Sequence, residues 1–555
     1  MIFTRIRSFC CIILIYCVMS VILSYQVLAA DSTIYVNSAE NPISDAYDSL
    51  YAISADGNTS VLGNEPYAMT ASGVQKVGEE SAATLTPSPS VTPVATPEPE
   101  FEDIPVAYST VKVGLYYGNT ALTEANLENN VGNGFLFGYF DDNREFHEVA
   151  RTDTRLLTVT SDLNITTEYN ITLGCYHIIR HGSYATFDEA KAAADLIGGF
   201  PAYYSGSFFV VYGHYQSKAE AEAALIETGI DGIAASASSK CITISQTGTD
   251  KIIFEFDSTY ALAIRPICES EKAITWFNQL RYYGDFQFSR LTNNQYLTAV
   301  NYVDIEDYVK GVIPYEMYVT WPMEALKAQA LCARNYVATN FNRYRSHGFD
   351  VTADIYSQVY KGIGDATETT NAAVDATAGQ YIRYQGAICQ TFFFSSDGGA
   401  TESSENVWGG NPIPYLVGVV DPYEDDVETY SKNWTYTLSA TQIQELVNAR
   451  MLTNLGEIED IACVYTDMGN IKSLTFIDKD GRSCTVSGNR CIAVMNAKSQ
   501  RFTVEKNENG DFAVTGSGWG HNCGMSQYGA YSMAKHHGKT AEEIIKFYYT
   551  GVYIR

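Results

Sequence analysis

One segment limits most strongly where this chain can fold: residues 84–105 read TLTPSPSVTPVATPEPEFEDIP. Proline lacks a backbone N–H and stiffens the chain, and the run has too few apolar side chains to build a core, so it is predicted to be an extended spacer. The folded part therefore starts near Val106, and the remaining length suits about three domains. Residues 30–105 are assigned as a disordered polar segment with this linker at its end.

The N-terminal segment has the order of a secretory signal peptide. Arg5 and Arg7 precede a long apolar run, which ends in small residues around Ala29. The run is also long enough to be an uncleaved membrane anchor. On either interpretation the rest of the chain is expected outside the cytoplasm.

Charge and cysteine content exclude several classes of partner and site. The formal net charge is −28, which argues against nucleic acid and anionic lipid surfaces, because both select clustered Lys and Arg. Three of the twelve cysteines lie in the N-terminal segment, and the other nine form no CxxC pair and no Cys/His spacing typical of zinc. The sequence therefore predicts no disulfide framework and no metal.

An internal repeat occupies the middle of the N-terminal half. Residues 176–194 (YHIIRHGSYATFDEAKAAA) align with residues 208–225 (FFVVYGHYQSKAEAEAAL). Each copy predicts a strand, a glycine turn and a helix opened by a capping box, Thr186 with Glu189 in the first. The pattern resembles the SPOR module, which binds peptidoglycan strands stripped of peptide; a small structural α+β insert is the alternative.

Glu316 is the one carboxylate in residues 311–322, GVIPYEMYVTWP. Apolar surroundings disfavour the charged form of a carboxyl group, so its pKa is predicted to rise toward that of a general acid at neutral pH. Thr320 is predicted to cap a helix over 321–343, which would leave Glu316 in the segment before the helix.

Two cations follow on the predicted helix. Lys327 and Arg334 stand at i and i+7, so they project from one side, and no acid is expected opposite them. Unpaired cations near Glu316 would suit an anionic sugar. Glu324 lies in the first turn, where the helix dipole favours a carboxylate, and it is left out of the site.

A glycine-rich segment near the C-terminus, residues 515–538, is the second dense patch. Its glycines let the backbone approach a ligand closely, while Trp519 and His521 offer a stacking ring and a polar contact. The glycines lack the spacing and the following Lys-Ser/Thr of a phosphate-binding loop.

Four segments, in this order, resemble the SpoIID/LytB family: YVKGVIPYEMYVTWPMEALKAQALCARNYV, FFFSSDGGATES, WGGNPIPYLVGVVDPYE and GSGWGHNCGMSQYGAYSMA with FYYTGVYI. The resemblance covers roughly residues 285–555. The chain departs from the family at Asn522, where glycine is usual. Some members also carry His/Cys metal ligands after the long helix, but this stretch has His347 and no cysteine, so no zinc is expected there.

The resemblance implies a fold class, a set of domains and a site. The expected chain is α+β, with a SpoIID-type domain and a small SPOR-like βα-repeat module. The expected divisions are 1–29, 30–105, 106–170, 171–233 and 234–555, the last with core motifs at 285–430 and 515–555. The implied catalytic acid is Glu316, and the implied substrate-binding residues are Lys327, Arg334, Ser395, Ser396, Tyr430, Lys432, His521 and Gln527.

The implied activity is a peptidoglycan lytic transglycosylase, needing no cofactor, in wall remodelling or sporulation. The family's sporulation member cleaves the glycan so that the C6 hydroxyl of N-acetylmuramic acid closes on C1, and one carboxylate then suffices. Two alternatives stay open. The chain could bind glycan without cutting it and enhance a partner amidase, or it could be a hydrolase with Asp397 or Asp421 as second acid.

Overall fold

The computed structural model describes residues 101–162, 165–166, 172–173, 175–269, 272–290 and 296–555, together with two short strands near the N-terminus. The predicted signal segment and the linker before residue 101 lie outside the described residues. The chain divides into two compact units, Met1–Val77 and Gly78–Arg555. In the first, the described residues form a hairpin of β1 (Ala68–Thr70) and β2 (Gly73–Gln75). No helix in the described part of the chain has the length and apolar character to cross a membrane.

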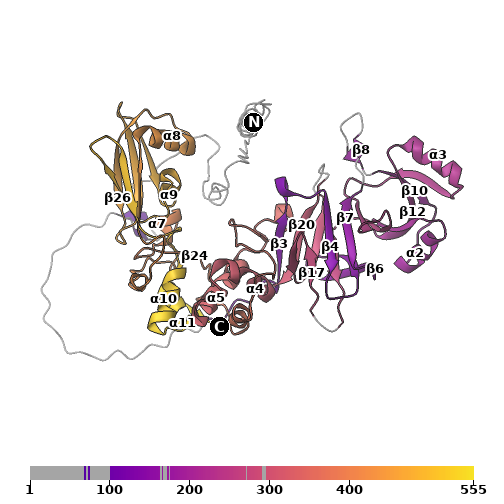
Figure 1. Cartoon of the computed structure of the whole chain (residues 1–555), viewed down its shortest axis with the longest axis horizontal. Helices are drawn as coiled ribbons and strands as arrows, with labels where there is room; N and C mark the ends of the chain where they lie inside the picture. The colour runs from indigo at the N-terminus through magenta and orange to yellow at the C-terminus, as the bar shows by residue number, and fades with distance from the viewer. Residues whose placement is uncertain are drawn as a thin grey trace, which may run out of the picture. The chain divides into compact units, whose positions relative to one another are not determined.

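Two large sheets build the N-terminal half of the second unit (Figure 1). The ten-stranded sheet has the order β13 (Gly232–Ser236), β10 (Tyr176–Arg180), β12 (Ser207–Tyr215), β11 (Phe200–Tyr204), β15 (Ile252–Asp257), β14 (Ile242–Gln246), β7 (Leu156–Ser161), β4 (Glu124–Asn129), β17 (Thr275–Phe277) and β18 (Leu280–Tyr282). The seven-stranded sheet has the order β21 (Val351–Thr352), β3 (Thr110–Tyr116), β20 (Thr298–Asp304), β19 (Asp285–Ser289), β16 (Leu262–Pro266), β5 (Phe135–Phe140) and β6 (Phe146–Thr152).

One hydrophobic core joins these two sheets. Phe137 of the seven-stranded sheet stacks on Phe254 of the ten-stranded sheet with ring centroids 5.7 Å apart, and Phe277 and Phe286 meet at 5.2 Å. Strands before residue 170 thus pair and pack with strands after residue 234. The divisions predicted at 170 and 234 therefore fall within a continuous sheet.

The strands and helices of the repeat form as its pattern predicts. Each copy gives a strand and a helix, α2 (Phe187–Asp195) and α3 (Lys218–Thr228). Gly182 lies in the turn after β10 as predicted, whereas Gly213, also with positive φ, lies inside β12 and forms no turn. Both capping boxes are confirmed, Thr186 with Glu189 and Ser217 with Glu220. Helix α2 packs on β11 and β12, and α3 packs on β10 and β13 (Figure 1).

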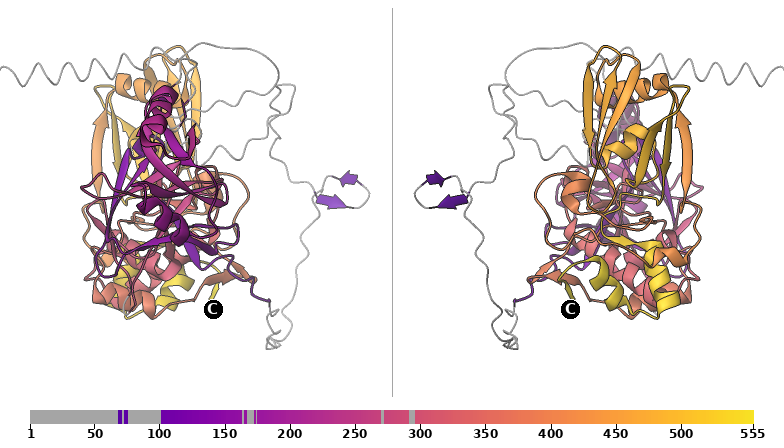
Figure 2. Two further views of the ribbon diagram at one scale, coloured as in Figure 1. Left: turned by 90° about the vertical axis from the view of Figure 1, so that its right-hand side faces the viewer. Right: turned by 90° about the vertical axis from the view of Figure 1, so that its left-hand side faces the viewer.

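A helical group follows the seven-stranded sheet. Helices α4 (Ile305–Glu316), α5 (Met323–Thr339), α6 (Glu368–Asp375), α10 (Gln527–His537) and α11 (Ala541–Tyr548) lie together around α5 (Figure 2). Helix α4 is not predicted from the sequence, although Asp304 caps it by accepting a hydrogen bond from the backbone N–H of Glu306 at 2.8 Å. The predicted capping residue is wrong: Pro322, not Thr320, precedes the first residue of α5.

The segment from 434 to 516 has a core of its own. Its strands are β25 (Trp434–Leu438), β26 (Ile458–Tyr465), β27 (Ile471–Asp478), β28 (Ser483–Ser487), β29 (Phe502–Lys506) and β30 (Phe512–Gly516). Helix α8 spans Ala440–Met451, and α9 (Arg490–Met495) packs beside it.

Short elements complete the described chain. They are β8 (Ile165–Thr166), β9 (Thr172–Leu173), β22 (Ile382–Tyr384), β23 (Ala387–Ile388), β24 (Phe393–Phe394), β31 (Met525–Ser526), β32 (Tyr553–Ile554) and α7 (Ser404–Trp408). The end of the linker belongs to the fold, because Ile104 donates its backbone N–H to the Gly386 carbonyl at 2.9 Å. The folded part therefore includes residues slightly before the predicted Val106.

Candidate active site

Glu316 is the last residue of α4, at the point where the chain leaves the helix for α5. Burial raises the pKa of Glu316 from 4.5 to about 7. The C-terminal end of a helix carries partial negative charge, which disfavours an ionised carboxylate in the same direction. The sequence prediction of a raised pKa is thus confirmed, although Glu316 lies at a helix end and not in a loop.

The amide of Gln527 approaches Glu316, and the amide of Gln329 lies behind it. The Nε2 of Gln527, at the start of α10, donates to Glu316 Oε2 at 3.4 Å and lies 3.4 Å from Gln329 Oε1 on α5. Both contacts are long, and the Nε2 of fully buried Gln329 has no partner among the described residues. Helices α4, α5 and α10 therefore meet at one acid and two loosely held amides.

Aromatic side chains flank this meeting point. Trp321 contacts the rings of Tyr318, Tyr528 and Tyr531 at centroid distances of 5.5, 5.1 and 4.9 Å. Tyr318 is 63% exposed, and Trp321 and Tyr528 are half-buried. Rings with an apolar face and a polar edge are suited to sugar rings.

A second aromatic pair extends this surface. Tyr430 and Trp519 are both exposed, their centroids lie 5.6 Å apart, and the ammonium of Lys498 is 5.4 Å from the Trp519 ring. The pKa of Tyr528 is raised by burial and by neighbouring Tyr318 and Tyr430. Tyr528 thus links the two groups, and we call the set Tyr318, Trp321, Tyr528, Tyr430 and Trp519 the aromatic row.

A buried carboxylate fixes the loop and helix that carry half of the site. Glu424 accepts hydrogen bonds from the backbone N–H groups of Asp397 at 2.9 Å and Gly398 at 3.1 Å, and from the hydroxyls of Ser396 and Ser526. Ser526 also caps α10. Glu424 therefore ties the 395–399 loop to the start of α10, where Gln527 follows.

The two other acids considered from the sequence belong to this buried group. Asp397 and Asp421 are essentially unexposed, and Asp421 accepts from the Tyr548 hydroxyl at 2.6 Å. Burial, with Glu424 and Asp421 beside it, raises the pKa of Asp397 well above its ordinary value. These carboxyls are held inside the fold and are not placed to activate a water molecule on a substrate, so the hydrolase alternative loses its second acid.

The prediction that Lys327 and Arg334 are unpaired is wrong. The Lys327 ammonium lies 2.8 Å from Glu324, one turn away on α5. Arg334 is fully buried, and its guanidinium donates to both oxygens of Glu306 at 2.9 and 2.6 Å. Arg334 therefore joins α5 to α4 and cannot reach a substrate. Lys327 is therefore paired with Glu324 and not with Glu316.

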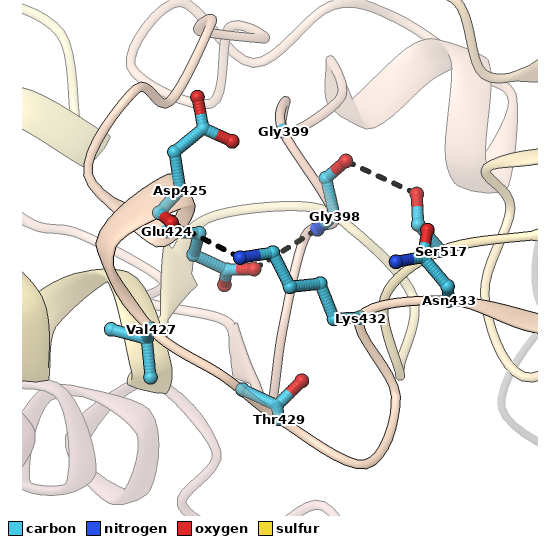
Figure 3. A pocket seen from close by; sticks show the side chains of 9 residues that line it. All are labelled: Gly398, Gly399, Glu424, Asp425, Val427, Thr429, Lys432, Asn433 and Ser517. Atoms are coloured by element: carbon cyan, nitrogen blue, oxygen red, sulfur yellow. Dashed lines mark hydrogen bonds between the residues drawn. The ribbon is translucent and has the colours of Figure 1, made fainter.

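Three other predicted substrate-binding residues also have partners within the fold. The Ser396 hydroxyl donates to Glu424 at 2.8 Å, and the Ser395 carbonyl accepts from the Tyr528 N–H at 3.0 Å. Lys432 donates to Glu428 at 3.1 Å and to a carbonyl. It lines a pocket that does not include Glu316 (Figure 3).

His521 is held as a neutral ring. Its Nδ1 accepts from the Cys523 N–H at 3.2 Å, so its Nε2–H donates to the Phe393 carbonyl at 3.1 Å. Burial lowers the pKa of His521 to about 4. The next residue, Asn522, adopts φ 62°, which explains how asparagine replaces the usual glycine. His521 thus shapes the loop, while Gln527 and Tyr430 alone among the predicted ligands lie at the acid or in the aromatic row.

Comparisons of the sequence with known proteins identify the family of this chain. The sequence model of the family described as SpoIID, Stage II sporulation protein, matches residues 293–384, which include α4 and α5. Stage II sporulation protein D of Bacillus subtilis is 33% identical over 272 residues, 46% of this chain and 76% of that protein. The chain belongs to the SpoIID family. An uncharacterized protein of Brachyspira hyodysenteriae is 37% identical over 52% of this chain and 75% of its own length.

One SpoIID-family relative carries a different functional name. The amidase enhancer of Bacillus subtilis is 31% identical over 44% of this chain, and the match spans 39% of that protein. Family membership thus covers proteins named for sporulation and for the enhancement of an amidase.

Proposed function

We propose that this SpoIID-family chain is a peptidoglycan lytic transglycosylase with Glu316 as its acid and base. The observation that carries the proposal is a single half-buried carboxyl whose pKa of about 7 suits both proton donation and proton return near neutral pH. Its hydrogen-bond partners among the described residues are the neutral amide of Gln527 and the backbone of Val359. A lone acid is the requirement of this chemistry, because hydrolytic glycosidases generally use two.

The reaction follows from one proton moving in and out. The protonated Glu316 donates to the oxygen that links C1 of N-acetylmuramic acid to the next sugar, and the C1–O bond breaks. The C6 hydroxyl oxygen of the same muramic residue forms the new bond to C1, and its proton passes to the Glu316 carboxylate. The acid is thereby regenerated, no water is consumed, and a 1,6-anhydro end results. Such assistance is worth about 10²–10⁴-fold.

Binding in this proposal rests on the aromatic row and on Gln527. The row offers ring faces beside the acid for successive sugars. The amide of Gln527 orients the Glu316 carboxyl and is placed to meet an acetamido or hydroxyl group. Arg334 takes no part in binding, since its guanidinium is buried against Glu306.

The cellular setting is part of the same proposal. Glycan cleavage requires the chain to act outside the cytoplasm, with residues 1–29 as signal peptide or anchor and the 84–105 linker as spacer. The repeat at 171–233 would then serve as a SPOR-like glycan-binding module.

A non-catalytic role is the second candidate, and the relative named amidase enhancer favours it. In that case the same surface binds glycan and the partner is a cell-wall amidase. The aromatic row would be required, and Glu316 would not.

Peptide-free glycan strands separate the two candidates. The full-length protein is incubated with the strands, and products are identified by mass spectrometry. Anhydromuramyl ends from the parent, with none from Glu316→Gln and undiminished strand binding by that variant, support the enzyme. Glu324→Gln is the matched control and should cleave as the parent does. Binding without products, or equal cleavage by Glu316→Gln, overturns the enzymatic proposal, and products carrying solvent oxygen would identify a hydrolase.

A further inference from the structure

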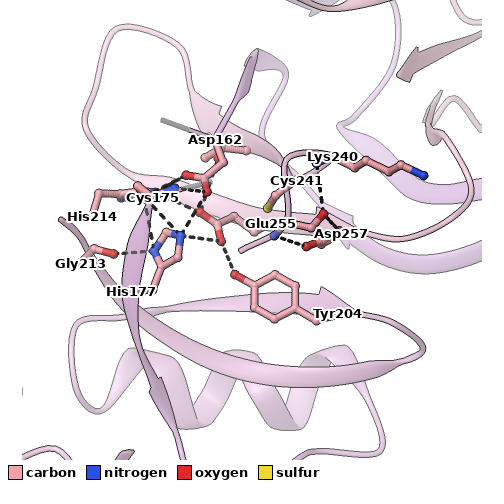
Figure 4. A network of polar contacts seen from close by, with 12 residues as sticks. Asp162, Cys175, His177, Tyr204, Gly213, His214, Lys240, Cys241, Glu255 and Asp257 are labelled. Atoms are coloured by element: carbon pink, nitrogen blue, oxygen red, sulfur yellow. Dashed lines mark hydrogen bonds and ion pairs between the residues drawn. The ribbon is translucent and has the colours of Figure 1, made fainter. Parts of the chain in front are cut away.

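A compact group of metal-ligating side chains lies in the repeat module, far along the sequence from Glu316 (Figure 4). Asp162 follows β7, Cys175 immediately precedes β10, His177 lies on β10 and His214 lies on β12. The first three are fully buried, and the His214 side chain is 20% exposed. Three strands of one sheet therefore converge on a single point.

The potential ligand atoms are already close to one another. Cys175 Sγ lies 3.0 Å from Asp162 Oδ1 and 3.3 Å from His177 Nε2. His177 Nε2 lies 3.4 Å from Asp162 Oδ2, and His214 Nε2 lies 3.7 Å from Asp162 Oδ1. All four ligand atoms fall within 4.8 Å of one another, as required of atoms that share one ion at bond lengths of about 2.0–2.3 Å.

We propose that Asp162, Cys175, His177 and His214 form a zinc site. One thiolate, two imidazoles and one carboxylate are ligands that zinc accepts in tetrahedral geometry. The mixture of one soft and three borderline or hard donors favours zinc over calcium or magnesium, which select oxygen alone.

The surroundings orient these ligands. The Nδ1 of His177 lies 2.7 Å from the Gly213 carbonyl, so the Nδ1–H donates there and the Nε2 lone pair faces the group. This is the outer contact that metal-bound histidines usually make. Glu255, also fully buried, lies 3.0 Å from His214 Nε2 and accepts from the Tyr204 hydroxyl at 2.6 Å. A divalent cation would offset the charge of the two buried carboxylates, Asp162 and Glu255, which the two histidines already approach.

A Cys–His–Asp catalytic group would use some of the same residues, but the geometry argues against it. The thiol of Cys175 is fully buried beside the carboxylates of Asp162 and Glu255, which disfavour a thiolate unless a cation is present. A substrate has no route to a sulfur atom without exposed surface. Four protein ligands leave no open position, so the site is structural.

The site would tie the repeat to the sheet beside it. Asp162 directly follows β7, whereas Cys175 immediately precedes the first repeat copy and His177 and His214 lie within the two copies. Zinc would therefore join the two parts of the ten-stranded sheet. The spacing Cys-x-His followed by a distant histidine matches no familiar zinc pattern, and the metal-free prediction from the sequence misses this group.

The test uses the full-length protein, with zinc chloride and cobalt chloride as probes. The parent protein, stripped with chelator, reloaded and freed of excess metal, should hold about one zinc per chain by elemental analysis. The cobalt form should show the absorption of thiolate bound to tetrahedral cobalt. Zinc should raise the melting temperature of the stripped parent.

Matched variants assign the signal to the site. Cys175→Ser should lose the cobalt–thiolate band, and His214→Gln should lose stoichiometric zinc. Cys463→Ser and His181→Gln change the same residue types elsewhere and should behave as the parent does. Absence of stoichiometric metal in the reloaded parent overturns the proposal, whatever the variants do. Full retention of the cobalt band by Cys175→Ser together with full retention of zinc by His214→Gln also overturns it.

Discussion

Replacing Glu316 by glutamine should stabilise the folded protein above neutral pH while removing the proposed acid. The pKa of Glu316 is raised from 4.5 to about 7 because burial removes water from the charged form. Each pKa unit corresponds to about 1.4 kcal/mol, so holding the carboxylate ionised in the fold costs up to about 3 kcal/mol. Glutamine keeps the shape of the side chain and carries no charge.

The sign follows from proton linkage. Between pH 4.5 and about 7 the folded state binds the Glu316 proton more tightly than the unfolded state does. The contribution of Glu316 to the free energy of unfolding of the parent therefore falls as the pH rises through this window, and it is constant above the window. The variant lacks this fall, so the stability difference, variant minus parent, should grow by up to about 3 kcal/mol across the window.

Urea denaturation of parent and variant at pH values from about 5 to about 8, followed by tryptophan fluorescence, measures this difference. Glu324→Gln is the control, because the Glu324 carboxylate is held by Lys327 at 2.8 Å and by the Ala541 N–H at 2.8 Å. That variant should gain no stability as the pH rises. A Glu316→Gln difference that stays flat from pH 5 to 8 would refute the reasoning, because the carboxyl would then titrate as an exposed group does.

Three further outcomes are expected. Gln527→Ala removes the hydrogen bond that lowers the pKa of Glu316, so the alkaline limb of the pH–rate profile of glycan cleavage should move upward in pH; an unchanged limb contradicts that contact. Arg334→Ala breaks a buried ion pair and should lower the free energy of unfolding by about 3–5 kcal/mol, whereas Lys327→Ala should cost under about 1 kcal/mol; equal effects in denaturation would return Arg334 to the list of surface cations. Trp519→Ala should weaken glycan binding about tenfold without changing the melting temperature, as measured by strand sedimentation, and full affinity would remove Trp519 from the binding surface.

Local patterns predicted the repeat well because its signals are local. The capping boxes act within the first turn of one helix, and both form as expected, at Thr186 and at Ser217. Helix α8 likewise begins at a local signal, since the Ser439 side chain accepts a hydrogen bond from the backbone N–H of Gln442. The division at 170 and 234 depends on which strands pair, and no local pattern carries that information.

The acid can be singled out from the sequence. Of the predicted substrate-binding residues, only Gln527 and Tyr430 lie at the acid or in the aromatic row. Glu316 has apolar neighbours along the chain, and burial follows from them. The ion pair of Arg334 is not predicted because its partner, Glu306, lies on α4. Propensity arguments do not predict α4, because it contains Gly311 and Pro314. A periodic face tells which residues share a side of a helix, and only packing tells what covers that side.

The site depends on a polar network that contains none of its reacting atoms. Gln527 reaches Glu316 because α10 starts where it does, and α10 starts there because Ser526 is held by Glu424. Glu424 accepts four hydrogen bonds from groups that are distant in sequence. Its buried carboxylate therefore holds these segments together. Burial raises the pKa of Asp397, and the neighbouring Glu424 carboxylate raises it further. The fold thus uses one buried carboxylate to position the amide that hydrogen-bonds to another, Glu316. Burial raises the pKa of Glu316 to about 7, and its place at the end of α4 acts in the same direction.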